Sequence, residues 1–503
     1  MEPSTAVDAT VATLRRRPAD LLPFYVLGGA VPGVTRVVTV FGLALAYAHL
    51  ELTGRLDRFA AALADSDLDP PDPQTEPEAF SQWATEVSGL VDVLVTPTVL
   101  AVLGGAVLVS LVLLVVLRAG VAAGQLAACH ARLRDERGLT AGIGGVRRHW
   151  LSFVGLLVLE VGLWIAVTLL MFGGVAAAGS LSTLAGLAAG ILAVPLWLGG
   201  VLLVRAVFAF APVAVVVDDA GVLGGIRGGF GFLRARPGAA GAYFLVVVAV
   251  LVGGGFAAAL LAVVGVGSLA ALLGLLAVFP GLDLLKTALF GGYRGTVGPP
   301  DGTAAPLSET VPAGLRRGWR AMVGFVRERP GLHALAFAVT LLGGATGWTI
   351  AGPLAGAVDS SIAARLDGQV PFAAAPEYFA NNWSVALTTA YAGVVLALPS
   401  AVSLWFNGFL LGAYARTEVA VRELVAFVVP HGVVEFPALF VAGALGLHLG
   451  IVGWRTWRGR RSRAALADAM ERAFRVLVGV GLLLAVAGFV EGFVSPYYYR
   501  PFL

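Results

Sequence analysis

His431 and Glu435 stand four positions apart within a long apolar segment, residues 424–452. Residues four apart share one face of an α-helix, so the two side chains should lie one turn from each other. Ionisable groups inside a membrane span are costly and often mark ion or proton pathways. We therefore expect Glu435 to be either a working centre, as a proton-linked group or the anchor for a partner, or a structural contact that locks this span.

Three further polar residues are candidate functional groups: Asn382, Asn407 and Glu160. Asn407 begins the string Asn407-Gly408-x-x-x-Gly412, in which small residues four apart permit two helices to approach closely. We expect Asn407 to hydrogen-bond across that contact; the alternative is that it lines a polar pathway. Glu160 lies inside another apolar segment, where a neighbouring helix could satisfy it, although the sequence identifies no partner.

Other ionisable residues in apolar segments have structural explanations. Asp283 and Lys286 are three positions apart near the end of a segment, where pairing and extension toward the interface would satisfy both. Glu491, in the last apolar segment, could be satisfied by a neighbouring helix.

The sequence contains none of the common catalytic signatures of soluble enzymes. A Walker loop, a His-Glu-x-x-His string, a Cys-x-x-Cys pair and a Gly-x-Ser-x-Gly turn are all absent. The six histidines are scattered, and none shares an apolar segment with enough carboxylates for a metal site. We therefore expect no catalytic, cofactor-binding or metal site, no cofactor and no enzyme activity.

The composition indicates that these polar residues are held by membrane helices. Of the 503 residues, 58% are apolar and 13% are charged, and the mean hydropathy is +0.87. Soluble proteins have about 45–50% apolar and about 25% charged residues. Apolar segments occur along the whole chain, which excludes a soluble enzyme with one anchor. The sequence predicts an all-α, polytopic integral membrane protein.

About eleven segments are long and apolar enough to be transmembrane helices. They lie near residues 24–48, 93–117, 151–177, 184–204, 241–264, 269–290, 333–353, 383–401, 402–420, 424–452 and 473–494.

The charges between these segments predict an orientation. Arginine-rich connections alternate with others, and loop 51–92 contains ten acidic residues beside Arg55 and Arg58. Because positive loops stay on the cytoplasmic side, we expect the N-terminus in the cytoplasm and the C-terminus outside, in the plasma membrane. The only cysteine, Cys129, is then expected in a cytoplasmic loop, 118–150. Because the arginines occur in short clusters between apolar segments, they indicate orientation in a bilayer. Nucleic acid is therefore not an expected partner.

A short repeat precedes several spans. An apolar residue followed by Arg-x-Arg-Pro occurs at 14–18, 233–237 and 326–330, with apolar residues four, seven and eleven positions before each proline. A degenerate copy ends at Trp150. This spacing predicts an amphipathic helix in the membrane interface that turns into the bilayer at the proline. Its arginines either anchor the hairpin or sense lipid head groups.

A Gly/Pro-rich linker at 295–313 divides the chain into a six-helix membrane domain, 1–294, and a five-helix membrane domain, 314–503. The second domain carries three ordered motifs: 379–382 (FANN), 407–412 (NGFLLG) and 430–450, which begins PHGVVEFPA. Over about 320–495 it resembles the stage II sporulation protein M family, an integral membrane family of about five spans. The best-known members scaffold a complex of peptidoglycan-degrading enzymes in spore formers. This chain departs from them in its additional N-terminal half.

The N-terminal domain has a weaker resemblance at residues 210–222, followed by 230–233. These segments are similar to the membrane domain associated with glycerophosphodiester phosphodiesterases. In that pattern a span ends in a short strand-like piece, and an interfacial helix follows. Gly228 and Gly229 stand where such segments often have Arg-Ser. The resemblance implies architecture, because no phosphodiesterase domain is attached.

Together these observations favour a non-enzymatic membrane protein that scaffolds a membrane-associated complex or organises the membrane. The alternative is a transporter or channel that uses polar residues in proline-broken helices, and a third possibility is an intramembrane enzyme acting on lipid. The expected partners are membrane lipids and other membrane or surface proteins, or further copies of this chain.

Overall fold

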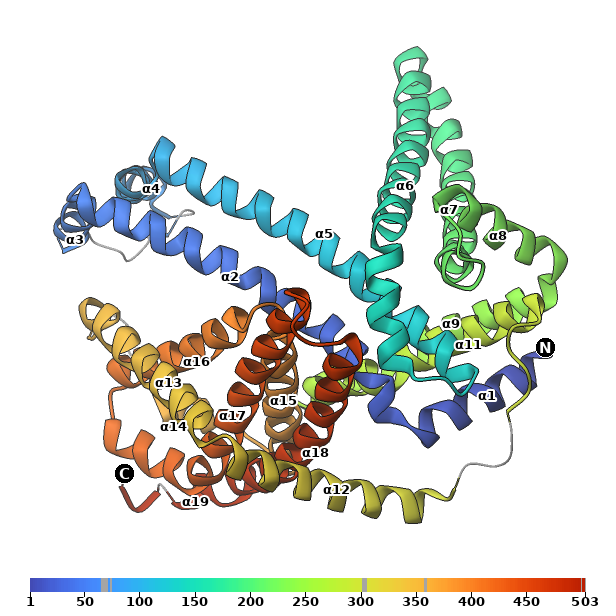
Figure 1. The fold of residues 1–503 in the computed structure, drawn as a ribbon. Helices are drawn as coiled ribbons and strands as arrows, with labels where there is room; N and C mark the ends of the chain where they lie inside the picture. The colour runs from blue at the N-terminus through green and yellow to red at the C-terminus, as the bar shows by residue number, and fades with distance from the viewer. Residues whose placement is uncertain (65–70, 73–74, 301–304, 357–359, 499, 503) are drawn as a thin grey trace. The chain divides into compact units, whose positions relative to one another are not determined.

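The computed structural model describes residues 1–64, 71–72, 75–300, 305–356, 360–498 and 500–502, which form helices and no strand (Figure 1). The N-terminal helices are α1 (Pro3–Arg16), α2 (Leu22–Leu52), α3 (Arg55–Ala64), α4 (Pro77–Leu94), α5 (Pro97–Leu133), α6 (Gly138–Leu181), α7 (Thr183–Val217), α8 (Val222–Ala235), α9 (Pro237–Val263), α10 (Gly267–Leu273) and α11 (Phe279–Arg294). The C-terminal helices are α12 (Leu307–Glu328), α13 (Pro330–Ile350), α14 (Ile362–Leu366), α15 (Pro371–Ala392), α16 (Leu398–Thr417), α17 (Val421–Trp457), α18 (Arg463–Phe493) and α19 (Ser495–Tyr498). The predicted all-α class is confirmed.

Among the described residues, nine helices are long and apolar enough to cross a membrane. They are α2, α5, α6, α7, α9, the continuous stretch Gly267–Arg294, α13, α17 and α18. The protein is therefore a multi-pass membrane protein. Two of the eleven expected spans coincide with the less apolar helices α15 and α16, so the count of eleven and the orientation stay predictions.

The boundary between α15 and α16 differs from the expected one. α15 runs from Pro371 to Ala392, whereas the span was expected at 383–401. Leu396 and Ala397 have φ of 66° and 65°, a left-handed conformation that ends the helical path, and Pro399 lies in the first turn of α16. The break therefore precedes the proline.

Contacts divide the chain into two compact units, Pro32–Val115 and the remainder, Met1–Val31 with Val116–Leu503. The first unit has a small apolar core of Ala46, Leu50 and Val99. Helix α3 and most of helix α4 lie in the acidic loop 51–92 of this unit. Residues 65–70, near the centre of that loop, lie outside the described part of the chain. The second unit holds every candidate site residue.

The two halves expected on either side of residues 295–313 contact each other within the larger unit. Ser268 N–H of α10 donates to the Glu377 carboxylate of α15 at 2.8 Å, and Arg137 donates to Asp468 of α18 at 2.7 Å. The hydrogen bond to Asp468 raises the pKa of the Arg137 guanidinium above its usual value. Because α12 begins at Leu307, the last residues of the expected linker are helical. The division into two domains stays a prediction.

An aromatic core holds α7, α8 and α11 together. The Phe210 and Phe232 rings are 4.6 Å apart, and Phe290 contacts Phe232 at 5.7 Å between ring centroids. A Cβ at Gly229 would lie 2.8 Å from the Val207 carbonyl oxygen, and one at Gly228 would lie 2.7 Å from the Ala214 Cβ. Close packing of α8 on α7 thus explains why glycines occupy these two positions. The expected strand-like piece is helical, because α7 continues to Val217.

The three Arg-x-Arg-Pro copies share one backbone geometry. α1, α8 and α12 each end directly before Arg17, Arg236 and Arg329, whose φ/ψ values are −145°/66°, −135°/57° and −134°/46°. A proline then begins the next helical segment in every copy. The expected helix and break are therefore present. The degenerate copy at Trp150 is not broken, because α6 has no proline there and continues from Gly138 to Leu181.

α13 and α16 form the closest helix contact near the candidate site. A Cβ at Gly408 would lie 2.0 Å from the Thr340 carbonyl oxygen, and one at Gly412 would lie 2.0 Å from that of Gly344. On α13, Gly343 and Gly347 are equally close to the α16 backbone. The glycine seam expected at Gly408 and Gly412 thus has α13 as its partner.

The expectation that Cys129 lies in a loop is wrong, because it lies in α5. α5 extends to Leu133 and α6 begins at Gly138, so the loop is confined to four residues, 134–137. Cys129 is 0% exposed, and its Sγ lies 3.2 Å from the Tyr25 hydroxyl. Tyr25 in turn donates to Asp283, which pairs with Lys286 at 2.7 Å as expected.

We predict that a maleimide will not label Cys129 in the native protein from either side of the membrane, because no surface of the thiol is accessible. Mass spectrometry should find the adduct only after denaturation. For the orientation, Cys129→Ser combined with Arg134→Cys places an exposed thiol in the 134–137 loop. An impermeant maleimide should leave it unlabelled in intact cells and label it in inside-out vesicles; the reverse pattern would contradict the expected orientation.

Candidate functional site

Three ionisable side chains converge between α17 and α18. His431 and Glu435 come from α17 and Glu491 from α18, and one ligand atom of each lies within 4.8 Å of the other two. His431 is 6% exposed and Glu491 is 8% exposed. The predicted proximity of His431 and Glu435 is present, and the neighbouring helix adds a second carboxylate.

Local contacts fix the imidazole. Its Nδ1 lies 3.0 Å from the Ser495 hydroxyl at the start of α19, and its ring meets that of Phe427 edge-on at 5.3 Å. The contact with Ser495 thus fixes the orientation of the ring beside the two carboxylates. The prolines that bracket the pair, Pro430 and Pro437, lie inside α17.

Small residues let α15 approach α18 beside the cluster. A Cβ at Gly488 would lie 2.9 Å from the Ala375 carbonyl oxygen, and one at Gly492 would lie 2.8 Å from the Ala375 Cβ. This close packing excludes bulky side chains next to Glu491, and it helps to keep the carboxylate buried.

The cluster contains carboxylate atoms without partners. Glu435 Oε2 is buried and has no hydrogen-bond donor in the described part of the chain. No hydrogen bond or ion pair joins Glu491 to another described residue either. Burying a carboxylate without a donor is costly, and a bound proton, a cation or an ordered water would offset that cost.

Glu435 also lines a cavity of about 210 Å³ among α13, α15, α16 and α17. Its polar lining consists of Thr340, Asn381, Asn382, Thr389, Asn407 and Glu435. The structure therefore brings Asn382, Asn407 and Glu435 to one space. Amide and hydroxyl groups in such a cavity can coordinate a cation or hydrogen-bond a small polar solute.

A second set of polar groups leads from the cluster toward the C-terminus. The Tyr378 hydroxyl of α15 is hydrogen-bonded to the Gln369 side chain. Gln369 and Gly492 line a separate pocket of about 400 Å³, together with Tyr497 and Arg500. Because Gly492 directly follows Glu491 on α18, this second pocket begins one residue from the cluster.

Asn407 and Glu160 have hydrogen-bond partners that the sequence did not identify. Asn407 donates to the Ser403 carbonyl of its own helix at 2.7 Å, so the bond expected across the glycine seam is wrong. One residue is a rotation of about 100° on a helix, which turns Asn407 toward the cavity while Gly408 faces α13. Glu160 of α6 pairs with Arg205 of α7 at 2.9 Å and is not part of the cluster.

Sequence reasoning did not place Glu491 in the cluster, because candidate metal sites were sought within single spans. His431 and Glu435 lie far along α17 from the turn at 458–462, and Glu491 lies far along α18 on the other side of that turn. Two antiparallel helices joined by a short turn bring such positions together. That hairpin geometry was the available signal.

The region that holds the cluster is similar to a known protein family. Residues 336–496 match the family described as Stage II sporulation protein M, and this match contains His431, Glu435 and Glu491. A segment of 125 residues is 20% identical to an uncharacterized protein of Methanocaldococcus jannaschii, covering 24% of this chain and 70% of that protein. No solved structure matches the chain. The resemblance of the N-terminal half to the phosphodiesterase-associated membrane domain stays a prediction.

Proposed function

We propose that the region similar to stage II sporulation protein M binds a small cation at the His431–Glu435–Glu491 cluster and passes it through the membrane. The observation that carries this proposal is the convergence of three ionisable side chains from two candidate spans, with Glu435 shared between the cluster and a polar cavity. The protein would act in the plasma membrane without a covalent step.

The chemistry of the cluster suits a cation. Two carboxylates and one imidazole are ligands for divalent transition metals, and the same groups can carry protons. A structural role alone would not require the carboxylate of Glu435 to be left without a donor in a buried site. A bound proton or metal ion would satisfy it, and the polar groups on either side would allow entry and exit.

A scaffold is the second candidate. The matched family favours it, as does the open surface of the N-terminal helices. In the most apolar stretch of α6, only 11% of the residues are buried inside the protein. In the corresponding stretch of α9, no residue is buried. These surfaces can contact lipid or other membrane proteins. A scaffold would use them and would have no need of the cluster.

Flux measurements distinguish the two candidates. The full-length protein should be reconstituted in liposomes loaded with dyes for H⁺, Mn²⁺ and Zn²⁺. We expect flux of one of these cations above that of protein-free liposomes. Glu491→Gln should reduce it at least about tenfold, because loss of even an outer-shell partner of a metal ligand costs about 10- to 100-fold in affinity or activity. Absence of flux for all three cations, with a stoichiometric membrane partner in native co-purification, would contradict transport and support the scaffold.

A further inference from the structure

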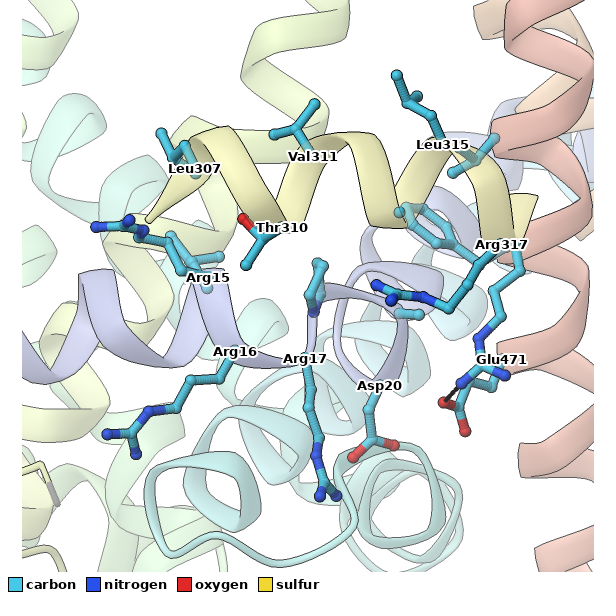
Figure 2. Close-up of a pocket in the computed structure, with 17 residues that line it drawn as sticks. Arg15, Arg16, Arg17, Asp20, Leu307, Thr310, Val311, Leu315, Arg317 and Glu471 are labelled. Carbon is cyan, nitrogen blue, oxygen red and sulfur yellow. Dashed lines mark hydrogen bonds and ion pairs between the residues drawn. The ribbon is translucent and has the colours of Figure 1, made fainter. Parts of the chain in front are cut away.

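Arginines surround a pocket of about 670 Å³ between the end of α1 and helix α12 (Figure 2). The basic lining residues are Arg15, Arg16, Arg17, Arg317 and Arg475, and the acidic ones are Asp20 and Glu471. α1 belongs to the first Arg-x-Arg-Pro copy and α12 to the third. The pocket lies apart from the His431–Glu435–Glu491 cluster and is not used by the proposed function.

The two acidic residues are already engaged. Asp20 accepts hydrogen bonds from the backbone N–H groups of Gly138 and Leu139, at 2.9 Å and 3.1 Å, at the start of α6. Glu471 pairs with Arg137 at 3.2 Å and with Arg475. These carboxylates therefore do not neutralise the arginines contributed by α1 and α12.

Arg15 and Arg317 have unused donors. The Arg15 Nη2 donates to the Ala305 carbonyl at 2.9 Å, but its Nε is buried and has no partner among the described residues. Arg317 is exposed and makes no hydrogen bond or ion pair with any described residue. A guanidinium presents its donors in a planar fork that matches the oxygens of a phosphate group.

The helices that carry these arginines expose apolar stripes. Leu307, Val311, Leu315 and Trp319 recur every fourth residue along α12 and are 38–56% exposed. Leu307, Val311 and Leu315 also line the pocket beside Thr310, so its wall on α12 is largely apolar (Figure 2). On α1, Val7 and Val11 are likewise exposed, at 43% and 46%. Such stripes are typical of amphipathic helices that lie in the membrane interface, at the depth of lipid head groups.

We propose that this pocket binds the phosphate of an anionic phospholipid, with Arg15 and Arg317 as its principal donors. The apolar stripes favour a lipid over a soluble phosphate compound, because they hold the pocket at the surface where lipid phosphates are concentrated. The lipid would join the first interfacial helix to the third across the 295–313 connection.

The test measures lipid binding to the purified full-length protein. Native mass spectrometry would titrate phosphatidylglycerol and phosphatidylcholine into the protein in detergent. We expect phosphatidylglycerol to bind more tightly, and Arg15→Gln with Arg317→Gln to weaken its binding about 30-fold, since each arginine near anionic lipid contributes about a factor of five. Thermal melting would verify that the double variant is folded.

The matched control is Arg227→Gln with Arg234→Gln on α8, which removes the same charge from the second copy of the repeat. We expect it to bind phosphatidylglycerol as the unmodified protein does. Equal weakening by both pairs, or equal binding of the two lipids, would overturn the site. Competition by glycerol 3-phosphate at the same concentration as the lipid would assign the pocket to a soluble phosphate compound and overturn the lipid proposal.

Discussion

Leucine in place of Gly408 should prevent the full-length protein from reaching a stable folded state. A Cβ at this position would lie 2.0 Å from the Thr340 carbonyl oxygen, so even the first side-chain carbon requires α16 to move away from α13. Overpacking a well-packed core with extra methylene groups typically costs about 1–3 kcal/mol. A whole side chain placed against a backbone carbonyl should therefore cost at least about 3 kcal/mol. That is a large part of a typical net stability of about 5–15 kcal/mol. The measurements are the monodisperse fraction in detergent and the thermal midpoint.

Gly331→Leu provides the control for this substitution. Gly331 lies in the first turn of α13, and nothing lies within 4 Å of a Cβ built there. Leucine is also a better helix former than glycine, so this variant should melt like the unmodified protein or slightly above it. If Gly408→Leu melts at the same temperature as Gly331→Leu, α13 and α16 do not approach as closely as they do in this structure.

Local sequence patterns predicted the features that depend on a single helix. The positions of Gly408 and Gly412 identified a close contact, and Asp283 with Lys286 formed the expected pair three residues apart. The Arg-x-Arg-Pro copies predicted both the amphipathic helices and their breaks. Each of these features follows from helical periodicity or proline geometry, which need no knowledge of neighbouring helices.

Features that join different helices could not be predicted in the same way. Glu160 has Arg205 as its partner only because α6 and α7 pack in one particular register. Cys129 is buried because α5 continues well beyond its apolar segment and packs against Tyr25 of α2. A helix that is apolar on all sides gives no periodic signal of which face is buried.

The candidate site combines both kinds of information. The four-residue spacing of His431 and Glu435 placed them on one helical face, and Asn382, Asn407 and Glu435 were selected as polar residues in apolar surroundings. That the last three line one cavity, and that Glu491 approaches from α18, depends on the packing of α15, α16, α17 and α18. The sequence therefore supplied most of the members but not their arrangement.

Glu435→Gln should leave the protein folded and inserted but reduce cation flux at least about tenfold. Glutamine has nearly the shape of glutamate and can hydrogen-bond to Glu491 or to a cavity amide, so packing around α17 should be preserved. It carries no charge and cannot exchange a proton, so the cluster would lose one of its two carboxylates. Because loss of an outer-shell partner of a ligand already lowers metal affinity or activity about 10- to 100-fold, loss of a ligand itself should cost at least as much. The measurement is flux in liposomes, with detergent extraction and thermal melting as tests of folding.

Two comparisons decide whether Glu435 acts in function or only in structure. Glu423→Gln makes the same chemical change in the first turn of α17, outside the cavity and the cluster, and should leave flux unchanged. Glu435→Ala removes both the charge and the hydrogen-bonding group, so it tests packing as well. If Glu435→Gln retains full flux while Glu435→Ala aggregates in detergent, Glu435 is a structural contact between α17 and its neighbours. Loss of flux in a well-folded Glu435→Gln, with Glu423→Gln unaffected, is the result that a cation site requires.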